Sequence, residues 1–264
     1  MRVHHLNCGD MRFLGLPLVC HVLLVEAPHG LVLVDAGFGL VDCAAPARRV
    51  GISRPLFHPA LDPEQSAARQ VERLGHARAD VTDVVVTHFD LDHIGGLADF
   101  PHARVHTTAA EVLAATVEPT WRERLRYRPA QWAHGPAFVE HGPGGDAWRG
   151  FAAVRPLDEA TDGIVVLPLP GHTRGHLAVA VDAGDRWLLH AGDAFYHPAT
   201  IGGPGRAPRR LRALEAVGAV DRRRVRDNHA RLAELRGRGD PDLAVFCAHD
   251  PASLAALDGS GDRP

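Results

Sequence analysis

The sequence predicts an α/β fold in one compact domain, and three observations support this prediction. The chain has 264 residues, 45% of them hydrophobic and 23% charged, so it is long enough to bury a large core. Short apolar runs bounded by Gly, Pro and Asp alternate with segments whose apolar residues recur at helical intervals. Several of these runs end in His or Asp, which indicates chemistry at strand ends. Residues 1–258 are assigned to a single domain and residues 259–264 to a frayed tail.

Two apolar runs near the N-terminus, residues 18–27 and 30–39, are typical of strands and are separated only by Pro28 and His29. We expect them to form a β-hairpin. Residues 62–74 carry apolar side chains at helical intervals, with Asp62 as the N-cap and Gly75 as the stop. This helix should lead into a strand formed by the run VTDVVVT, residues 81–87.

The rest of the chain predicts an insertion followed by a second β-rich half. Residues 110–150 begin as a helix, pass through an aromatic and basic stretch and end in HGPGGD, so they are assigned to an insertion over the site. Residues 164–170, 177–183 and 186–192 are typical of strands ended by Pro, Asp or Gly. Residues 209–238 predict arginine-rich amphipathic helices, and residues 242–250 return as a strand.

Residues 87–96, THFDLDHIGG, concentrate metal-binding side chains directly after a predicted strand. His88, Asp90, Asp92 and His93 all lie within six positions of one another. Imidazole and carboxylate groups suit Zn²⁺ and also Fe²⁺ or Mn²⁺. Because short side chains at a strand end can converge without a long loop, this run predicts a hydrolytic metal centre.

Further candidate ligands follow later apolar runs. His172 and His176 lie in PGHTRGH, Asp193 lies in HAGDAFY, and His249 lies in FCAHD. A single histidine at a strand end is ordinarily a polar residue with a local hydrogen-bond partner. The seven candidates that remain when His176 is set aside are not explained by chance in this order.

This order of residues resembles the metallo-β-lactamase fold superfamily. The pattern of that superfamily is His-X-His-X-Asp-His, then a histidine, a bridging aspartate and a final histidine, and the resemblance covers nearly the whole chain. It implies a four-layer αββα sandwich and two divalent metal ions. In residue terms it implies that His88 and His172 bind one ion, that Asp92, His93 and His249 bind the second, and that Asp193 bridges them.

Asp90 stands where the superfamily usually has its second histidine. With two divalent ions and a hydroxide, ligation by Asp90 would lower the net charge of the cluster from one positive charge to zero, so a bound water should keep a higher pKa. Zinc is the expected metal, with iron or manganese as alternatives because Asp90 is a hard oxygen ligand. The carboxylate is similar to that of flavodiiron proteins in the same superfamily, but the chain has no recognisable flavin-binding domain.

Five further assignments concern residues around the metals. His176 should point away from them and orient its loop, and Asp35 resembles the superfamily's strand-terminal Asp-X-Gly, where the carboxylate either holds a ligating histidine or forms a turn. The segment GDAFY resembles Gly-Asp-Ala-X-Tyr of N-acyl-homoserine lactonases. This implies that Tyr196 donates to the substrate oxyanion, with a buried structural role as the alternative. Asp92 or Asp250 could pass a proton to the leaving alcohol.

The expected reaction is hydrolysis of a small lactone or ester by a metal-bridging hydroxide, as in N-acyl-homoserine lactonase-like enzymes. The alternatives are a thioester hydrolase of the glyoxalase II type, an iron-dependent oxidoreductase and a non-enzymatic binding protein. A β-lactamase is disfavoured because Asp193 replaces the cysteine of one major branch. Tyr127, Trp132 and Phe138 either wall an acyl-chain pocket or pack the core of the insertion, and core packing is favoured.

Composition limits the partners. The formal net charge of −3 offers no general attraction for nucleic acid or an anionic membrane. The four cysteines lack CxxC spacing, which favours buried, inert thiols. No run is long enough for a membrane span or a signal peptide, so a cytoplasmic location is expected. The expected partner is a small-molecule substrate, and homodimer formation is left open.

Overall fold

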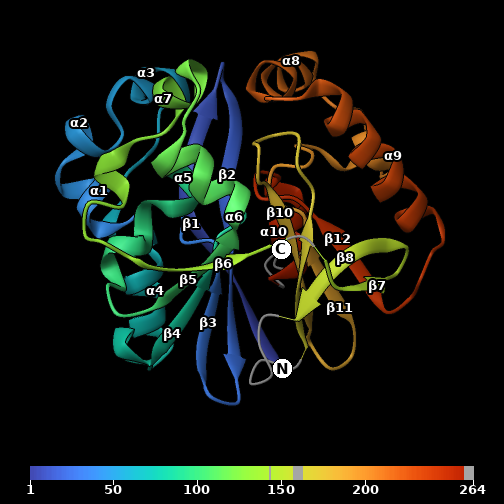
Figure 1. Cartoon of the computed structure of the whole chain (residues 1–264), viewed down its shortest axis with the longest axis horizontal. Helices are drawn as coiled ribbons and strands as arrows, with labels where there is room; N and C mark the ends of the chain where they lie inside the picture. Colours follow the sequence, from blue (N-terminus) through green and yellow to red (C-terminus); the bar gives the residue numbers. More distant parts are fainter. Residues whose placement is uncertain (143, 157–162, 259–264) are drawn as a thin grey trace, which may run out of the picture.

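The computed structural model describes residues 1–142, 144–156 and 163–258. Two six-stranded sheets pack face to face, and helices cover their outer faces (Figure 1). The apolar layer between the sheets includes Leu23, Val34 and Val85 from the first sheet and Val166 and Val179 from the second. Two further apolar clusters fill the space between each sheet and its outer helices. This arrangement is the predicted four-layer αββα sandwich.

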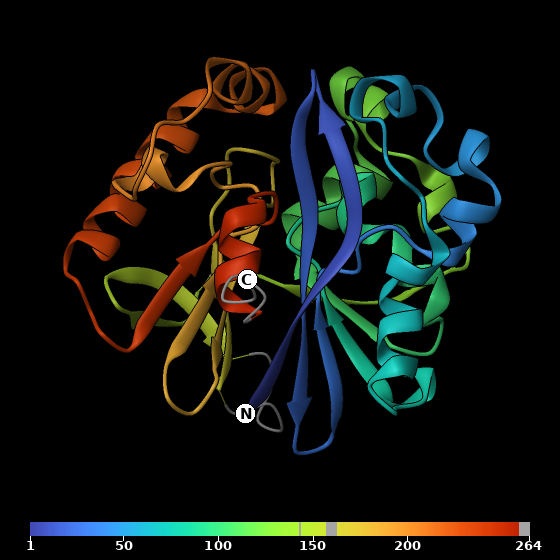
Figure 2. The same cartoon turned by 180° about the vertical axis from the view of Figure 1, so that it is seen from behind.

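The first sheet has the strand order β1-β2-β3-β4-β5-β6. Its strands are β1 (Arg2–Phe13), β2 (Leu16–Ala27), β3 (Gly30–Val34), β4 (Val81–Val85), β5 (Arg104–Thr108) and β6 (Ala137–His141). The strands from β1 to β3 are antiparallel, so the predicted hairpin is confirmed as β2–β3, whereas those from β3 to β6 are parallel. β1 and β2 form a long ribbon along the junction of the two halves (Figure 2).

The second sheet has the order β12-β11-β10-β9-β8-β7. Its strands are β7 (Asp146–Trp148), β8 (Phe151–Pro156), β9 (Ile164–Pro168), β10 (Leu177–Asp182), β11 (Trp187–His190) and β12 (Leu243–Phe246). Neighbouring strands are antiparallel except for β11 and β12. Five of the six residues of β10 are buried, because this strand has an apolar layer on both faces, and its sequence LAVAVD is therefore almost continuously apolar.

The helices lie mainly outside the sheets. They are α1 (Leu40–Ala44), α2 (Pro46–Arg49), α3 (Arg54–Phe57), α4 (Ala67–Arg73), α5 (Leu91–Ile94), α6 (Ala109–Val112), α7 (Trp121–Arg126), α8 (Arg209–Gly218), α9 (Arg222–Gly237) and α10 (Pro251–Leu257). Short 3-10 turns span Gly51–Ser53, Pro63–Gln65, Arg78–Asp80, Gly95–Asp99, Pro129–Gln131 and Pro198–Ile201, and a π-helical turn spans Leu113–Val117. Within the described part of the chain, no helix has both the length and the apolar character needed to cross a membrane.

Two sequence predictions differ from the structure in detail. The helix predicted from Asp62 begins at Ala67, because Ser66 accepts from the backbone N–H of Arg69, while Asp62 caps only the preceding 3-10 turn. The segment assigned to an insertion, residues 110–150, supplies β6 to the first sheet and β7 to the second and also contains α7. The predicted frayed tail, residues 259–264, lies outside the described residues.

Candidate metal centre

The predicted ligands follow the ends of four strands that come from both sheets. His88 follows β4, His172 follows β9, Asp193 follows β11 and His249 follows β12, each within four residues of the strand end. The backbone of each strand is fixed by its sheet, so the first side chains beyond it are held in place. Seven side chains form two groups that could each hold an ion: His88, Asp90, His172 and Asp193, and then Asp92, His93 and His249.

The first group is closely spaced. Nε2 of His88 lies 3.2 Å from Oδ2 of Asp90 and 3.8 Å from Oδ2 of Asp193. Nε2 of His172 lies 3.2 Å and 3.3 Å from the same two oxygens. The two imidazoles and two carboxylates therefore point at one common position.

The second group uses the other oxygen of Asp193. Oδ1 of Asp193 lies 3.3 Å from Nε2 of His93 and 3.0 Å from Nε2 of His249. Oδ2 of Asp92 completes the group at 3.9 Å and 3.5 Å from these two nitrogens. Since Oδ2 of Asp193 faces the first group, this carboxylate lies between the two groups as a bridging ligand would.

These side chains fit divalent metal ions. Four ligand atoms placed tetrahedrally at the usual Zn–N and Zn–O distances would be roughly 3.4 Å apart, and the distances above run from 3.0 to 3.9 Å. Nδ1 of His249 donates to the carbonyl oxygen of Val19 at 2.8 Å, so Nε2 of the neutral ring carries a lone pair. Nε2 of His93 faces it at 3.4 Å. A cation between the two nitrogens would satisfy both.

Burial and neighbouring charges shift the pKa values of two histidines in these groups. Burial, together with the neighbouring His93, lowers the pKa of His88 to about 3, so its imidazole is neutral at physiological pH, as coordination of an ion requires. Burial also lowers the pKa of His249, but the carboxylates of Asp193 and Asp92 outweigh it and raise that pKa to about 9. Without an ion, these buried carboxylates favour the protonated imidazoles. A divalent ion that binds here would displace those protons.

Asp35 orients one of the ligands. Its Oδ2 accepts from Nδ1 of His93 at 2.8 Å, and its two oxygens also accept from the backbone and the hydroxyl of Thr87. The backbone of Asp35 adopts φ +60°, a conformation that few residues other than Gly and Asn adopt easily. Of the two roles considered for Asp35, the structure shows the contact to His93, a member of the second candidate ligand group.

His176 orients another ligand and does not belong to either group. Its Nδ1 donates to the carbonyl oxygen of Leu169 at 3.1 Å, which leaves Nε2 to accept from the backbone N–H of Asp193 at 3.0 Å. His176 therefore fixes the backbone that carries the shared carboxylate. This is the orienting role expected from the sequence.

Glu111, at α6, was not identified from the sequence, although it joins two ligand-bearing loops. Its Oε1 accepts from the backbone N–H of Phe89 and from the hydroxyl of Tyr127, both at 2.9 Å. Its Oε2 accepts from the hydroxyl of Thr173 at 2.7 Å and from the backbone N–H of Gly175 at 2.9 Å. The only sequence signal was the position of Glu111 three residues after Thr108, which caps α6.

Arg126, at the end of α7, is the second site residue that sequence analysis missed. Its Nε donates to Oδ1 of Asp90 and its Nη2 donates to Oδ2, each at 2.5 Å. Nη2 also lies 2.5 Å from Nε2 of His172. Asp90 thus contacts both the other members of its ligand group and the guanidinium of Arg126.

The other predicted residues fall into different places. Tyr196 is buried beside both groups, with its ring centroid 6.0 Å from that of His172 and 5.4 Å from that of His249. Asp250 instead caps α10 by accepting from the backbone N–H of Ser253, and it is not a member of either ligand group. The three aromatic residues of the predicted insertion pack around Phe89, as the favoured core role required: Tyr127, Trp132 and Phe138.

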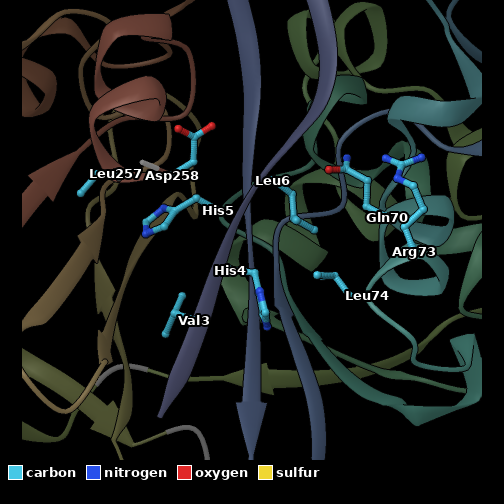
Figure 3. Close-up of a pocket in the computed structure, with 9 residues that line it drawn as sticks. All are labelled: Val3, His4, His5, Leu6, Gln70, Arg73, Leu74, Leu257 and Asp258. Atoms are coloured by element: carbon cyan, nitrogen blue, oxygen red, sulfur yellow. The ribbon is translucent and has the colours of Figure 1, made fainter. Parts of the chain in front are cut away.

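A surface pocket of about 330 Å³ lies away from the metal ligands. Its walls come from the start of β1, from α4 and from the end of α10 (Figure 3). His4 and His5 project from opposite sides of β1, and Gln70 and Arg73 lie beyond Leu6 (Figure 3). No member of either ligand group lines this pocket.

Comparison with known families agrees with this geometry. A family model described as the metallo-beta-lactamase superfamily matches residues 15–249. The chain belongs to this superfamily. It is 58% identical over 251 residues to the probable metallo-hydrolase Rv2300c of Mycobacterium tuberculosis, which covers 95% of this chain and 81% of the relative. The protein is thus a metallo-hydrolase.

Two other similarities of this metallo-hydrolase are informative. It is 30% identical over 192 residues to the human acyl-coenzyme A thioesterase MBLAC2, a match that spans 69% of this chain and 60% of the relative. Its fold matches a solved N-acyl homoserine lactone hydrolase with the product N-hexanoyl-L-homoserine at its catalytic metal centre. That match has a TM-score of 0.70 and 17% identity, and it covers 97% of this chain and 95% of the other.

Proposed function

We propose that this metallo-hydrolase uses two divalent ions, with zinc as the expected metal, to open lactones or other carboxylic esters of small molecules. The observation that carries the proposal is the position of Tyr196 beside two ligand groups that share Asp193. When bound, the two ions would lower the pKa of a water molecule and polarise the substrate carbonyl.

Tyr196 is suited to donate a hydrogen bond to the carbonyl oxygen as negative charge develops on it. Burial, together with the neighbouring Asp193 and Asp90, raises the pKa of the Tyr196 phenol well above its ordinary value. The phenol is therefore protonated at neutral pH and can act as a donor. A donor that is already in place before the reaction stabilises an oxyanion more than water does.

Asp92 is the proposed proton carrier for the leaving alcohol. Its side chain is 15% exposed, whereas that of Asp193 is 3% exposed. Burial, together with the neighbouring Asp193 and Asp90, raises the pKa of Asp92 in the absence of an ion. An ion held by His93 and His249 would make the carboxyl of Asp92 more acidic. One of its oxygens would bind the ion, and the other would carry the proton to the leaving alcohol.

Exposed apolar side chains on α7 and α8, the two helices that Arg126 joins, favour a substrate with an apolar portion. Trp121 and Leu125 on α7 are 68% and 67% exposed, and Val217 at the end of α8 is 77% exposed. These segments are joined because Arg126 on α7 donates to the carbonyl oxygen of Gly218 at 2.6 Å. Exposed apolar groups beside a polar centre are typical of a binding site for an acyl group.

A thioester hydrolase is the second candidate, because the match to an acyl-coenzyme A thioesterase spans 69% of this chain. The two candidates differ in the leaving group, an alcohol in one case and a thiol in the other. The protein reconstituted with Zn²⁺, Mn²⁺ or Fe²⁺ should be assayed against N-hexanoyl-homoserine lactone, an aryl ester and hexanoyl-coenzyme A. We expect kcat/KM for the lactone or the aryl ester to exceed that for the thioester. A preference for the thioester would favour the second candidate, and turnover of none of them would contradict both.

A further inference from the structure

Arg126 is a largely buried cation that connects three parts of the metal centre. Its side chain is 17% exposed. Nη1 donates to the carbonyl oxygens of Gly218 at 2.6 Å and His172 at 3.2 Å, while Nε and Nη2 hold Asp90. The guanidinium is thus anchored to α8 and to the His172 loop through backbone carbonyls. These anchors hold it against Asp90.

The two oxygens of Asp90 have different surroundings. Oδ2 points at the common position of the first ligand group, 3.2 Å from Nε2 of both His88 and His172. Oδ1 accepts from Nε of Arg126. Because an imidazole that coordinates an ion through Nε2 has no lone pair left there, the contact between Nη2 and His172 would be given up on metal binding. The Nε–Oδ1 contact and the backbone anchors do not conflict with an ion.

We propose that Asp90 and Arg126 act as one unit that takes the place of a neutral histidine ligand. Asp90 supplies Oδ2 to the first ion, and Arg126 is a positioning residue that fixes the carboxylate through Oδ1. The guanidinium also offsets the charge of Asp90, so the pair is neutral, as an imidazole is. The net charge of the loaded centre then equals that of a centre with histidine at this position. The inference concerns metal binding and holds whichever substrate the enzyme hydrolyses.

The pair can be tested by replacing each member and then both. In Arg126→Met, Asp90 loses its fixed orientation and its counter-charge, and we expect the affinity for one of the two ions to fall at least about tenfold. Arg126→Lys keeps the charge but lacks the planar guanidinium, which donates to Oδ1 of Asp90 and to two backbone carbonyls at once, so its affinity should lie between those of Arg126→Met and the wild type. Arg124→Met, which removes an exposed arginine from the same helix, is the matched control and should bind both ions normally.

The double variant separates this role from a purely structural one. Asp90→His alone leaves a buried guanidinium beside two cations without its partner, so it should bind the first ion weakly. Asp90→His combined with Arg126→Met removes both charges and should restore the affinity for two ions to within a fewfold of the wild type. The measurements are metal content by mass spectrometry, Zn²⁺ affinity by competition with a chelator, and the visible absorption of the Co²⁺ form.

Three results would overturn the proposal. One is an Arg126→Met protein that binds two ions with wild-type affinity and an unchanged Co²⁺ spectrum. Another is tighter binding in that variant, because the guanidinium would then be a competitor of the ion. The third is a folded double variant that binds as weakly as Arg126→Met, because Arg126 would then act only by joining α7, α8 and the His172 loop.

Discussion

Oδ2 of Asp35 accepts a hydrogen bond of 2.8 Å from Nδ1 of His93, although the two residues are 58 positions apart in the chain. Asp35 follows β3 and His93 lies in α5, which follows β4. The parallel pairing of β3 with β4 brings these positions together. The contact places the proton of His93 on Nδ1 and directs the lone pair of Nε2 into the second ligand group.

Asp35→Asn should weaken the second metal site without unfolding the protein. Asparagine adopts positive φ more readily than most residues, so the backbone is not strained, and the loss of one buried acceptor oxygen should lower the free energy of unfolding of the metal-free protein by about 1–3 kcal/mol. The neutral amide is a poorer acceptor for the imidazole, and affinity for one ion should fall roughly 10- to 100-fold. Chelator competition measures the affinity. Equal affinity for both ions in variant and wild type would show that the contact does not tune His93.

Tyr196→Phe should impair turnover but not metal binding. The substitution removes only the phenol oxygen from a buried ring. We expect kcat for the preferred ester to fall roughly 100-fold, with KM and metal content nearly unchanged, because the lost hydrogen bond forms in the transition state. Steady-state kinetics measure kcat and KM of the variant. Wild-type kcat in this variant would leave Tyr196 with only the structural role.

Glu111→Gln should destabilise the two loops that carry His88 and His172. The Glu111 side chain accepts four hydrogen bonds through its carboxylate, so an amide NH₂ in its place would face a donor instead of accepting from it. We expect the free energy of unfolding to fall by about 2–4 kcal/mol in urea titrations. Glu118→Gln, at an exposed position, is the control and should have no comparable effect. Equal loss in both variants would contradict the role of Glu111.

The sequence predicted the members of the two candidate ligand groups better than the residues that hold them in place. Seven ligand candidates could be identified because each follows an apolar run within a short local motif. Arg126 could not, because its contact with Asp90 spans 36 positions and depends on how α7 lies over the site. β1 was also missed, because a register shift between Asn7 and Asp10 interrupts the alternation of apolar and polar residues.

Glu215 should make stability depend on pH near neutrality. Burial raises the pKa of its carboxyl from 4.5 to about 7, so the folded state binds a proton more tightly than the unfolded state does. The resulting stabilisation is fully present below about pH 4.5 and is lost as the pH rises through about 7. Glu215→Gln keeps the neutral shape and should therefore be more stable than the wild type at pH 8, by about 1–3 kcal/mol, but not at pH 4.5.

Urea unfolding at the two pH values measures this effect. The control is Glu234→Gln, which changes a glutamate of α9 whose side chain is 73% exposed. It should shift the unfolding free energy equally at both pH values. If Glu215→Gln also changes the unfolding free energy by the same amount at both pH values, the carboxyl of Glu215 does not titrate in this range.

The central claim, that two ligand groups joined by Asp193 form one hydrolytic metal centre, is tested most directly by the metal content and ester turnover of His93→Ala. The wild type should bind two divalent ions per chain, and the variant should bind one, because Asp92 and His249 are left to hold the second ion with Asp193. Its kcat/KM should fall by at least about 1,000-fold. A folded His93→Ala protein that retains two ions and full turnover would contradict the account.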